Sequence, residues 1–226
     1  PATENQVSTG YSCAVHPSPS ISFCGVRKRT GAFPFRIVPV VSLVAVFVSY
    51  LSLTIAGQAF FTFQWDILLL ETGFFSIFFA PWQLWPRKLS LRPGSTAPTS
   101  RVGLFLLKLL LFKLMLMSGV VKLTSGDHTW WNLTALDYHY WSQPLPTVFG
   151  WWADKSPEWF KHFSVAFCLV VEIIVPFFIW APRRLRLIAA GLLIFLQVAV
   201  EITGNYCFFN LLTIALCLML IDDSVV

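Results

Sequence analysis

Long and nearly uninterrupted apolar stretches dominate this chain. Most reach the ~17–25 residues that a helix needs to cross a bilayer, and a soluble domain would instead alternate apolar and polar faces. The stretches are Val38–Phe61, Ile67–Trp85, Val102–Val121, Phe163–Ala181, Leu187–Val200 and Tyr206–Ile221. The pattern predicts an all-α fold, a polytopic transmembrane helix bundle with five to six apolar helices.

The composition supports a membrane protein. Hydrophobic residues make up 56% of the chain and charged residues only 12%, whereas soluble domains carry about 25% charged residues. The net charge of +5 does not indicate a nucleic-acid partner, because the basic residues cluster at the ends of the apolar stretches. Such clusters set the orientation of a chain in the membrane. Membrane lipid is therefore the expected partner.

The organisation predicts an irregular N-terminal segment, residues 1–36, followed by a multi-span membrane domain, residues 37–223. The N-terminal segment is rich in Ser, Thr, Pro and Gly without helical periodicity, and it begins with Pro1 rather than Met, as expected of a fragment or a trimmed product. Its cysteines, Cys13 and Cys24, would form a disulfide only outside the cytosol.

Basic residues predict the sidedness of the membrane domain. If every stretch crosses, all the clusters fall on one side, which is the cytosolic side by the positive-inside rule. The clusters are Arg27, Lys28, Arg29 and Arg36; Arg87, Lys88, Arg92 and Arg101; and Arg183, Arg184 and Arg186. The loop 124–162 then lies in the lumen, and it carries a glycosylation pattern at Asn132. The last stretch is interrupted by Asn205, Tyr206 and Asn210, so it crosses, re-enters or lies along the interface. We expect Gly204–Asn210 to pack against another span, because Asn side chains in lipid need hydrogen-bond partners.

Several polar residues lie in or beside the apolar stretches. A charge near the bilayer centre costs at least ~2.5 kcal/mol, so each should face the bundle interior and have a partner. The residues are Asp66, Glu71, Lys108, Lys113, Glu172, Gln197 and Glu201. We expect Glu71 and Glu172 to pair with Lys108 and Lys113. The set forms either structural ion pairs or a polar relay.

The loop also contains a dense polar and aromatic patch, Asp137, Tyr138, His139 and Tyr140. It is either catalytic or a packed corner, and a histidine without an oriented partner does not meet the geometric requirement for a general base. The histidines are dispersed, and no second ligand lies at helical spacing, so no metal site is predicted. No phosphate-binding loop or nucleophile elbow is present, and no cofactor is expected.

Four motifs resemble the membrane-domain signatures of the lipase maturation factor family. They occur in the family's order, and the resemblance extends over about residues 38–223. The motifs are FQWDILLLETG at Phe63–Gly73, SGVVKLTS at Ser118–Ser125, LTALDYHY at Leu133–Tyr140 and GNYCFFNLLT at Gly204–Thr213.

The resemblance implies a multi-pass protein of the endoplasmic-reticulum membrane. Members of the family assist the folding and assembly of secreted homodimeric lipases such as lipoprotein lipase. The family is described with five spans, a cytosolic N-terminus and a large lumenal C-terminal domain. This chain ends at Val226, so that domain is expected to be absent from it. A final stretch that does not span the membrane would reconcile the family topology with the six apolar stretches.

The resemblance also implies binding of lipase clients and no enzymatic activity. Trp130 and Trp131, with the patch Asp137, Tyr138, His139 and Tyr140, are the expected client-binding residues. Large aromatic rings supply contact area at binding hot spots, but they also anchor loops in lipid headgroups. The rival interpretation is a membrane enzyme or transporter that uses the buried Lys and Glu residues. The layout is similar to that of vitamin K-dependent carboxylase, although no motif supports that likeness.

Overall fold

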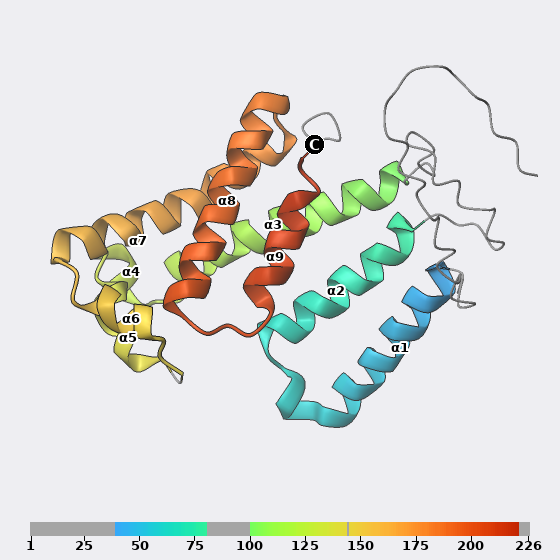
Figure 1. Ribbon diagram of the computed structural model, residues 1–226, viewed down its shortest axis with the longest axis horizontal. Coiled ribbons are helices and arrows are strands. Elements are labelled where there is room, and N and C mark those ends of the chain that lie inside the picture. The colour runs from blue at the N-terminus through green and yellow to red at the C-terminus, as the bar shows by residue number, and fades with distance from the viewer. Residues whose placement is uncertain (1–38, 81–99, 144, 222–226) are drawn as a thin grey trace, which may run out of the picture. The chain divides into compact units, whose positions relative to one another are not determined.

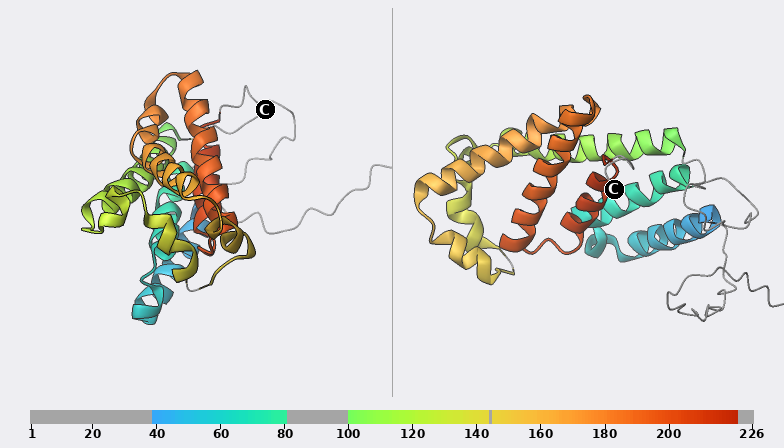
Figure 2. Two further views of the ribbon diagram at one scale, coloured as in Figure 1. Left: turned by 90° about the vertical axis from the view of Figure 1, so that its left-hand side faces the viewer. Right: turned by 45° about the horizontal axis from the view of Figure 1, so that its top comes forward.

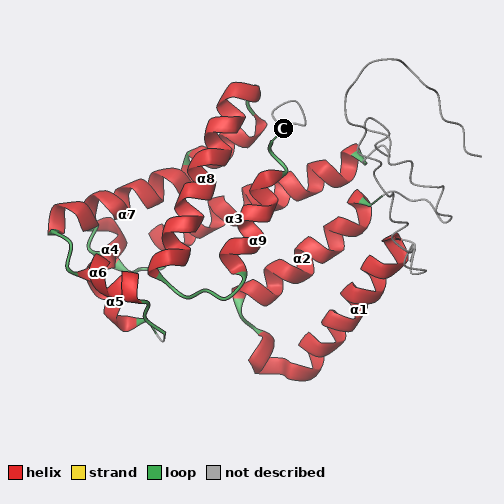
Figure 3. Cartoon of the chain, in the orientation of Figure 1, coloured by secondary structure: helices red, strands yellow, loops and turns green. Residues whose placement is uncertain are grey.

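The computed structural model describes residues 39–80, 100–143 and 145–221. The chain divides into two units, Pro1–Phe35 and Arg36–Val226, and all described residues belong to the second unit. The predicted irregular segment lies outside the described residues, as do Cys13, Cys24 and the basic clusters at residues 27–36 and 87–92. Within the described ranges every regular element is a helix, so the predicted all-α class is confirmed (Figures 1 and 3).

The long helices are α1 (Pro39–Gly57), α2 (Gln64–Phe79), α3 (Arg101–Thr124), α7 (Glu158–Ile173) and α8 (Arg183–Thr203). A shorter helix, α9 (Phe209–Leu218), follows α8. Between α3 and α7 lie three short helices, α4 (His128–Trp131), α5 (Ala135–Ser142) and α6 (Val148–Asp154). Two 3₁₀ segments, η1 (Gln58–Phe61) and η2 (Val175–Trp180), extend α1 and α7.

Four segments of the described chain are long and apolar enough to span a membrane: Val40–Phe61, Arg101–Thr124, Glu158–Trp180 and Arg183–Thr203. The prediction of five to six spanning helices was therefore wrong. The described helix α2 has 16 residues and α9 has 10, so at ~1.5 Å per residue they measure about 24 and 15 Å. Both are shorter than the ~30 Å of hydrocarbon.

The interruption in the stretch Phe163–Ala181 and the turn between the last two helices have local causes. Pro176 lacks a backbone N–H and cannot donate to the carbonyl one turn earlier, so α7 ends and the tighter η2 begins. Between α8 and α9 the backbone turns, and Cys207 adopts a φ of 56°. Asn210 is buried at this break, as predicted, whereas Asn205 is exposed.

Helix α3 lies at the centre of the unit and packs against α2, α7, η2 and α9. Its inward face supplies Leu110, Leu111 and Met115 to the core, where they meet buried residues of α8 such as Leu193. The start of α3 lies directly on the end of α2: a Cβ at Gly103 would lie 2.3 Å from Phe79 Cα. Small residues allow this backbone approach, which is a principal source of stability between membrane helices.

The short helices α4, α5 and α6, which we call the helical cap, gather at one end of α3, α7 and α8 (Figures 1 and 2). The cap contacts the end of α3, the helix α7 and α8. The described basic residues Arg101, Arg183 and Arg184 lie at the opposite ends of α3 and α8. This arrangement fits the predicted separation of basic residues from the loop 124–162. The loop is largely helical, which hydropathy alone does not reveal.

Gly103 provides a test of the close packing between α2 and α3. We expect Gly103→Ala to lower the stability of the solubilised protein by ~1–3 kcal/mol, because the added methyl overlaps the α2 backbone. Gly191→Ala is the matched control, since nothing lies within 4 Å of a Cβ there. Thermal unfolding in detergent measures both variants. An equal melting temperature for the two would contradict the packing.

Candidate functional site: a buried polar cluster beneath the helical cap

A buried ion pair joins α3 to α7. Lys122 Nζ donates to both carboxylate oxygens of Glu172 and lies 2.5 Å from Oε2. The Glu172 side chain is 7% exposed and that of Lys122 is 22% exposed. Removing either partner would leave a charge in a poorly hydrated site, which is far more costly than an absent surface pair.

Neighbouring residues complete this cluster. Ser118 Oγ donates to Glu172 Oε1 at 3.1 Å, and Lys122 Nζ lies 3.5 Å from Cys168 Sγ. Gly119 brings the helices together, because a Cβ at this position would lie 2.6 Å from Ile173 Cγ1. We call Ser118, Lys122, Cys168 and Glu172 the polar cluster. Within the described ranges, no group of three or more His, Cys, Asp or Glu residues is arranged to hold a metal ion.

The polar cluster connects to the helical cap through aromatic rings. Lys122 Nζ lies 5.0 Å from the centre of the Trp130 ring, a cation–π contact. His139 Nε2 and the Tyr206 hydroxyl share a hydrogen bond of 3.1 Å, and their rings stack with 4° between the planes. Burial lowers the pKa of His139 below its usual 6.5, and the charge of Lys122 lowers it further. Burial raises the pKa of Tyr206.

Ion pairs and hydrogen bonds fix the cap on the long helices. Lys161 of α7 lies 3.3 Å from Asp137 of α5 and 3.8 Å from Asp154 of α6. Gln143 Nε2 donates to the carbonyl of Thr203 at 3.2 Å, and Thr147 Oγ1 donates to the carbonyl of Ile202 at 3.0 Å. The last carbonyls of a helix have no partner within it, so these side chains satisfy the end of α8. Asp137 therefore has a structural partner.

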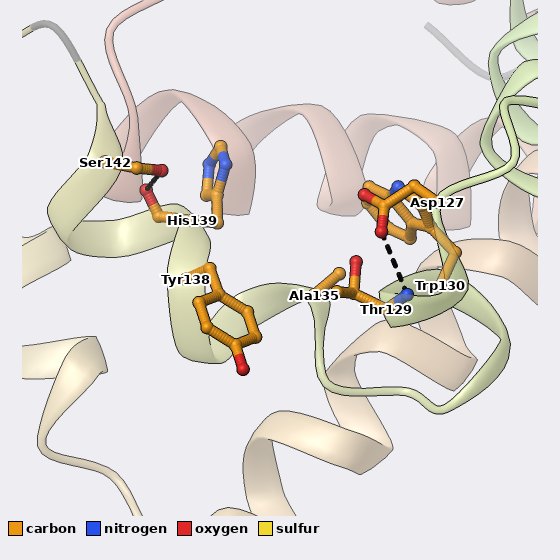
Figure 4. A pocket seen from close by; sticks show the side chains of 7 residues that line it. All are labelled: Asp127, Thr129, Trp130, Ala135, Tyr138, His139 and Ser142. Atoms are coloured by element: carbon orange, nitrogen blue, oxygen red, sulfur yellow. Dashed lines mark hydrogen bonds between the residues drawn. The ribbon is translucent and has the colours of Figure 1, made fainter.

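A shallow pocket of about 360 Å³ opens on the cap (Figure 4). Its lining comes from the start of α4 and from α5, and comprises Asp127, Thr129, Trp130, Ala135, Tyr138, His139 and Ser142. The Asp127 carboxylate accepts a hydrogen bond from the backbone N–H of Thr129, which lowers the pKa of Asp127. The pocket thus joins three of the expected client-binding residues, Trp130, Tyr138 and His139.

Large aromatic side chains cover the outside of the cap. Trp131, Trp141 and Trp152 are 64%, 67% and 64% exposed. Two of these rings are held by their indole N–H groups, which bond the carbonyls of Leu123 and Asp137 at 3.0 and 2.6 Å. The rings are fixed while their faces remain accessible. Asn132, the predicted glycosylation acceptor, is exposed in the same region.

The structure gives most of the other predicted intramembrane residues a partner. Glu71 pairs with Lys113 as expected, at 2.5 Å. The prediction that this pair faces the bundle interior was wrong, because the Lys113 side chain is mostly exposed and that of Glu71 is partly exposed. Asp66 accepts from the Tyr50 hydroxyl, also at 2.5 Å, and Glu201 Oε2 accepts from Asn210 Nδ2 at 2.9 Å. Lys108 is half-buried on α3. Gln197 is buried, with Nε2 3.5 Å from Met115 Sδ.

The expected lysine partners of Glu172 were wrong, because its partner is Lys122. Lys122 lies just beyond the apolar stretch Val102–Val121, so hydropathy places it outside the membrane. Two signals in the sequence point to it. It belongs to the motif Ser118–Ser125, and it follows Ser118 by four residues, which places both side chains on one face of α3.

Together these features define a class: a polytopic all-helical membrane domain with an aromatic cap at one end, fastened by a buried ion pair. A family model described as the lipase maturation factor transmembrane domain matches residues 18–226. The chain belongs to the lipase maturation factor family, which confirms the resemblance that the four motifs carry.

The chain is similar to curated members of both named branches. It is 48% identical to lipase maturation factor 2 of Gallus gallus over 178 residues, which is 78% of this chain and 24% of that protein. It is 46% identical to lipase maturation factor 2 of Homo sapiens over 211 residues, 90% of this chain and 30% of that protein. It is 40% identical to lipase maturation factor 1 of Mus musculus over 182 residues, which is 80% of this chain and 31% of that protein.

The chain thus spans about a quarter to a third of the length of these relatives. No solved structure matches it. The motif Ser118–Ser125 supplies Lys122, whose charge helps to lower the pKa of His139 in the motif Leu133–Tyr140. His139 in turn bonds Tyr206 of the distant motif Gly204–Thr213. We therefore take the polar cluster, with Trp130, His139 and Tyr206 beside it, as the candidate site.

The ion pair in the polar cluster can be tested by a double-variant cycle. We expect Lys122→Met to lower stability by ~3–5 kcal/mol, because it leaves the Glu172 carboxylate buried without its cation. Lys122→Met combined with Glu172→Leu should recover most of that loss. Unfolding of the solubilised protein is the measurement. If the two substitutions were simply additive, the pair would not be energetically coupled.

Proposed function

We propose that this chain is the membrane domain of an endoplasmic-reticulum maturation factor that assists the folding and assembly of secreted lipases such as lipoprotein lipase. The main support is the exposed aromatic surface of the helical cap, on a chain that belongs to the lipase maturation factor family. The role is binding of a client, without a chemical step.

The physical reason for such a factor is the aggregation of folding intermediates. A lipase that acts as a dimer exposes apolar surface before its subunits meet, and transiently exposed apolar surface promotes aggregation. Fixed tryptophan rings offer contact area at little cost in side-chain entropy. Trp131 and Trp141 have this arrangement, because the indole N–H of Trp131 is already bonded to Leu123 of α3 and that of Trp141 to Asp137 of α5.

The proposed binding surface divides the expected residues into two groups. Trp131 and Tyr138 are exposed and would contact a client directly. Trp130, His139 and Tyr140 are half-buried, and Asp137 pairs with Lys161, so these residues would shape the surface from beneath. Trp141 and Trp152 extend the exposed group.

This proposal requires the cap to be lumenal. A cysteine at exposed Ser142, in a variant without the native cysteines, should react with an impermeant thiol reagent only after microsomes are permeabilised. The basic residues at the opposite helix ends give the reason. A glycan on exposed Asn132, removed by Asn132→Gln, is a second readout. Labelling of Ser142→Cys in intact microsomes would place the cap in the cytosol and contradict the proposal.

Client binding is tested in cells that lack their own maturation factors. The complete polypeptide carrying Trp131→Ala, Trp141→Ala and Trp152→Ala should capture at least ~10-fold less lipase. Truncating even one hot-spot residue costs ~2 kcal/mol or more, and a tenfold loss of affinity needs only ~1.4 kcal/mol. Secreted lipase activity should fall with it. Co-precipitation and the activity in the medium are the measurements.

Trp180→Ala is the matched control, because Trp180 is also exposed but lies on η2, away from the cap. It should leave both readouts unchanged at equal protein level. Unchanged lipase capture by the triple variant would show that the rings only anchor the cap in lipid headgroups. Normal capture with lost secretion in Lys122→Arg, at equal protein level, would instead support an enzyme.

A further inference from the structure

A second ion pair of the membrane domain lies on an outer surface. Lys113 Nζ of α3 donates to Glu71 Oε1 of α2 at 2.5 Å, and the two side chains are 58% and 33% exposed. Lys113 lies near the middle of the 24-residue helix α3, so at ~1.5 Å per residue it is about 16 Å from the nearer helix end. A lysine near the end of a span can extend its ammonium to the interface, but one at this depth cannot.

The surroundings of Lys113 are apolar. The outward face of α3 carries a stripe of exposed side chains at helical spacing: Val102, Phe105, Leu109, Met117 and Val121. Lys113 interrupts this stripe at its centre, on the face of α3 opposite the core residue Leu111. In a lone copy the stripe would face lipid, where a half-exposed ion pair is costly. The pair therefore requires a cover.

The hydrogen-bonding groups of the pair indicate the kind of cover. An ammonium group has three N–H donors, and among the described residues Lys113 uses one of them, on Glu71. Glu71 Oε2 accepts no hydrogen bond from the described residues. The surface thus presents a positive and a negative group side by side, with donors and an acceptor still available. The surface that fits it carries the same ion pair turned around, with a carboxylate opposite Lys113 and an ammonium group opposite Glu71.

We propose that a second copy of this chain packs on α2 and α3, with Lys113 of each copy donating to Glu71 of the other. Two copies with the same membrane orientation are related by a two-fold axis along the membrane normal. This axis keeps both ion pairs at the same depth and sets each lysine opposite a glutamate. An isologous contact requires a self-complementary surface of this kind. The apolar stripe of α3 would pack around the resulting four-charge ring.

Charge reversal between differently tagged copies tests the ring. Lys113→Glu gives a copy with two acidic groups, and Glu71→Lys gives a copy with two basic groups. Each should capture itself roughly tenfold less than the unmodified chain, because like charges face each other across the axis. Together they should restore capture, because opposite charges then meet. Co-precipitation of full chains from native lipid discs is the measurement.

Two further variants keep the test decisive if a single reversal impairs folding. Glu71→Lys with Lys113→Glu should self-associate like the unmodified chain, since both pairs are preserved. Glu71→Leu with Lys113→Leu should accumulate normally in lipid yet lose self-association. A single copy per disc in the unmodified protein would overturn the proposal. Undiminished self-capture by the Leu variant, or a different protein bound at this face, would overturn it as well.

Discussion

The buried ion pair between Lys122 and Glu172 is the contact on which the rest of the membrane domain depends. Lipid provides no hydrophobic force between helices, so they associate through close packing and polar contacts. On α3 the residues for close packing and for polar contact lie within one turn. Gly119 lets α7 approach, and Lys122 bonds both oxygens of Glu172. The same lysine lies beneath the Trp130 ring of the cap. One side chain thereby links two spans and the cap.

The position of the helical cap depends on the ion pair that joins α3 to α7. Once α3 and α7 are joined, Lys161 is positioned to bind Asp137 and Asp154, and the short helices between the spans are tied down at both ends. The stack of His139 on Tyr206 ties the cap to the break between α8 and α9. With its polar groups satisfied from beneath, the cap can hold tryptophan faces outward. The contacts that hold the cap on the long helices therefore also keep the tryptophan rings exposed.

Sequence patterns predicted the helical class, the apolar stretches and the break at Gly204–Asn210, because these depend on local composition. They also singled out His139 and Tyr140, because aromatic and titratable residues are adjacent there. They did not predict which helices are too short to span, since the ends of α2 and α9 depend on backbone turns. They did not pair Lys122 with Glu172, which lies 50 residues away, because the relative rotation of two helices is not encoded in hydropathy.

The two lysine–glutamate pairs show why the surroundings of a charge matter more than its presence in an apolar stretch. Hydropathy treats Lys113 as the more deeply placed charge and Lys122 as peripheral. In the folded chain Lys122 faces α7 and contacts Glu172, Cys168 and Trp130, whereas Lys113 faces outward among apolar side chains. The first pair is satisfied within one copy. Among the described residues, the second pair retains hydrogen-bonding groups without partners at that depth, which the proposed second copy would satisfy. The same chemistry thus stabilises the fold at one site and, in the proposed dimer, the assembly at the other.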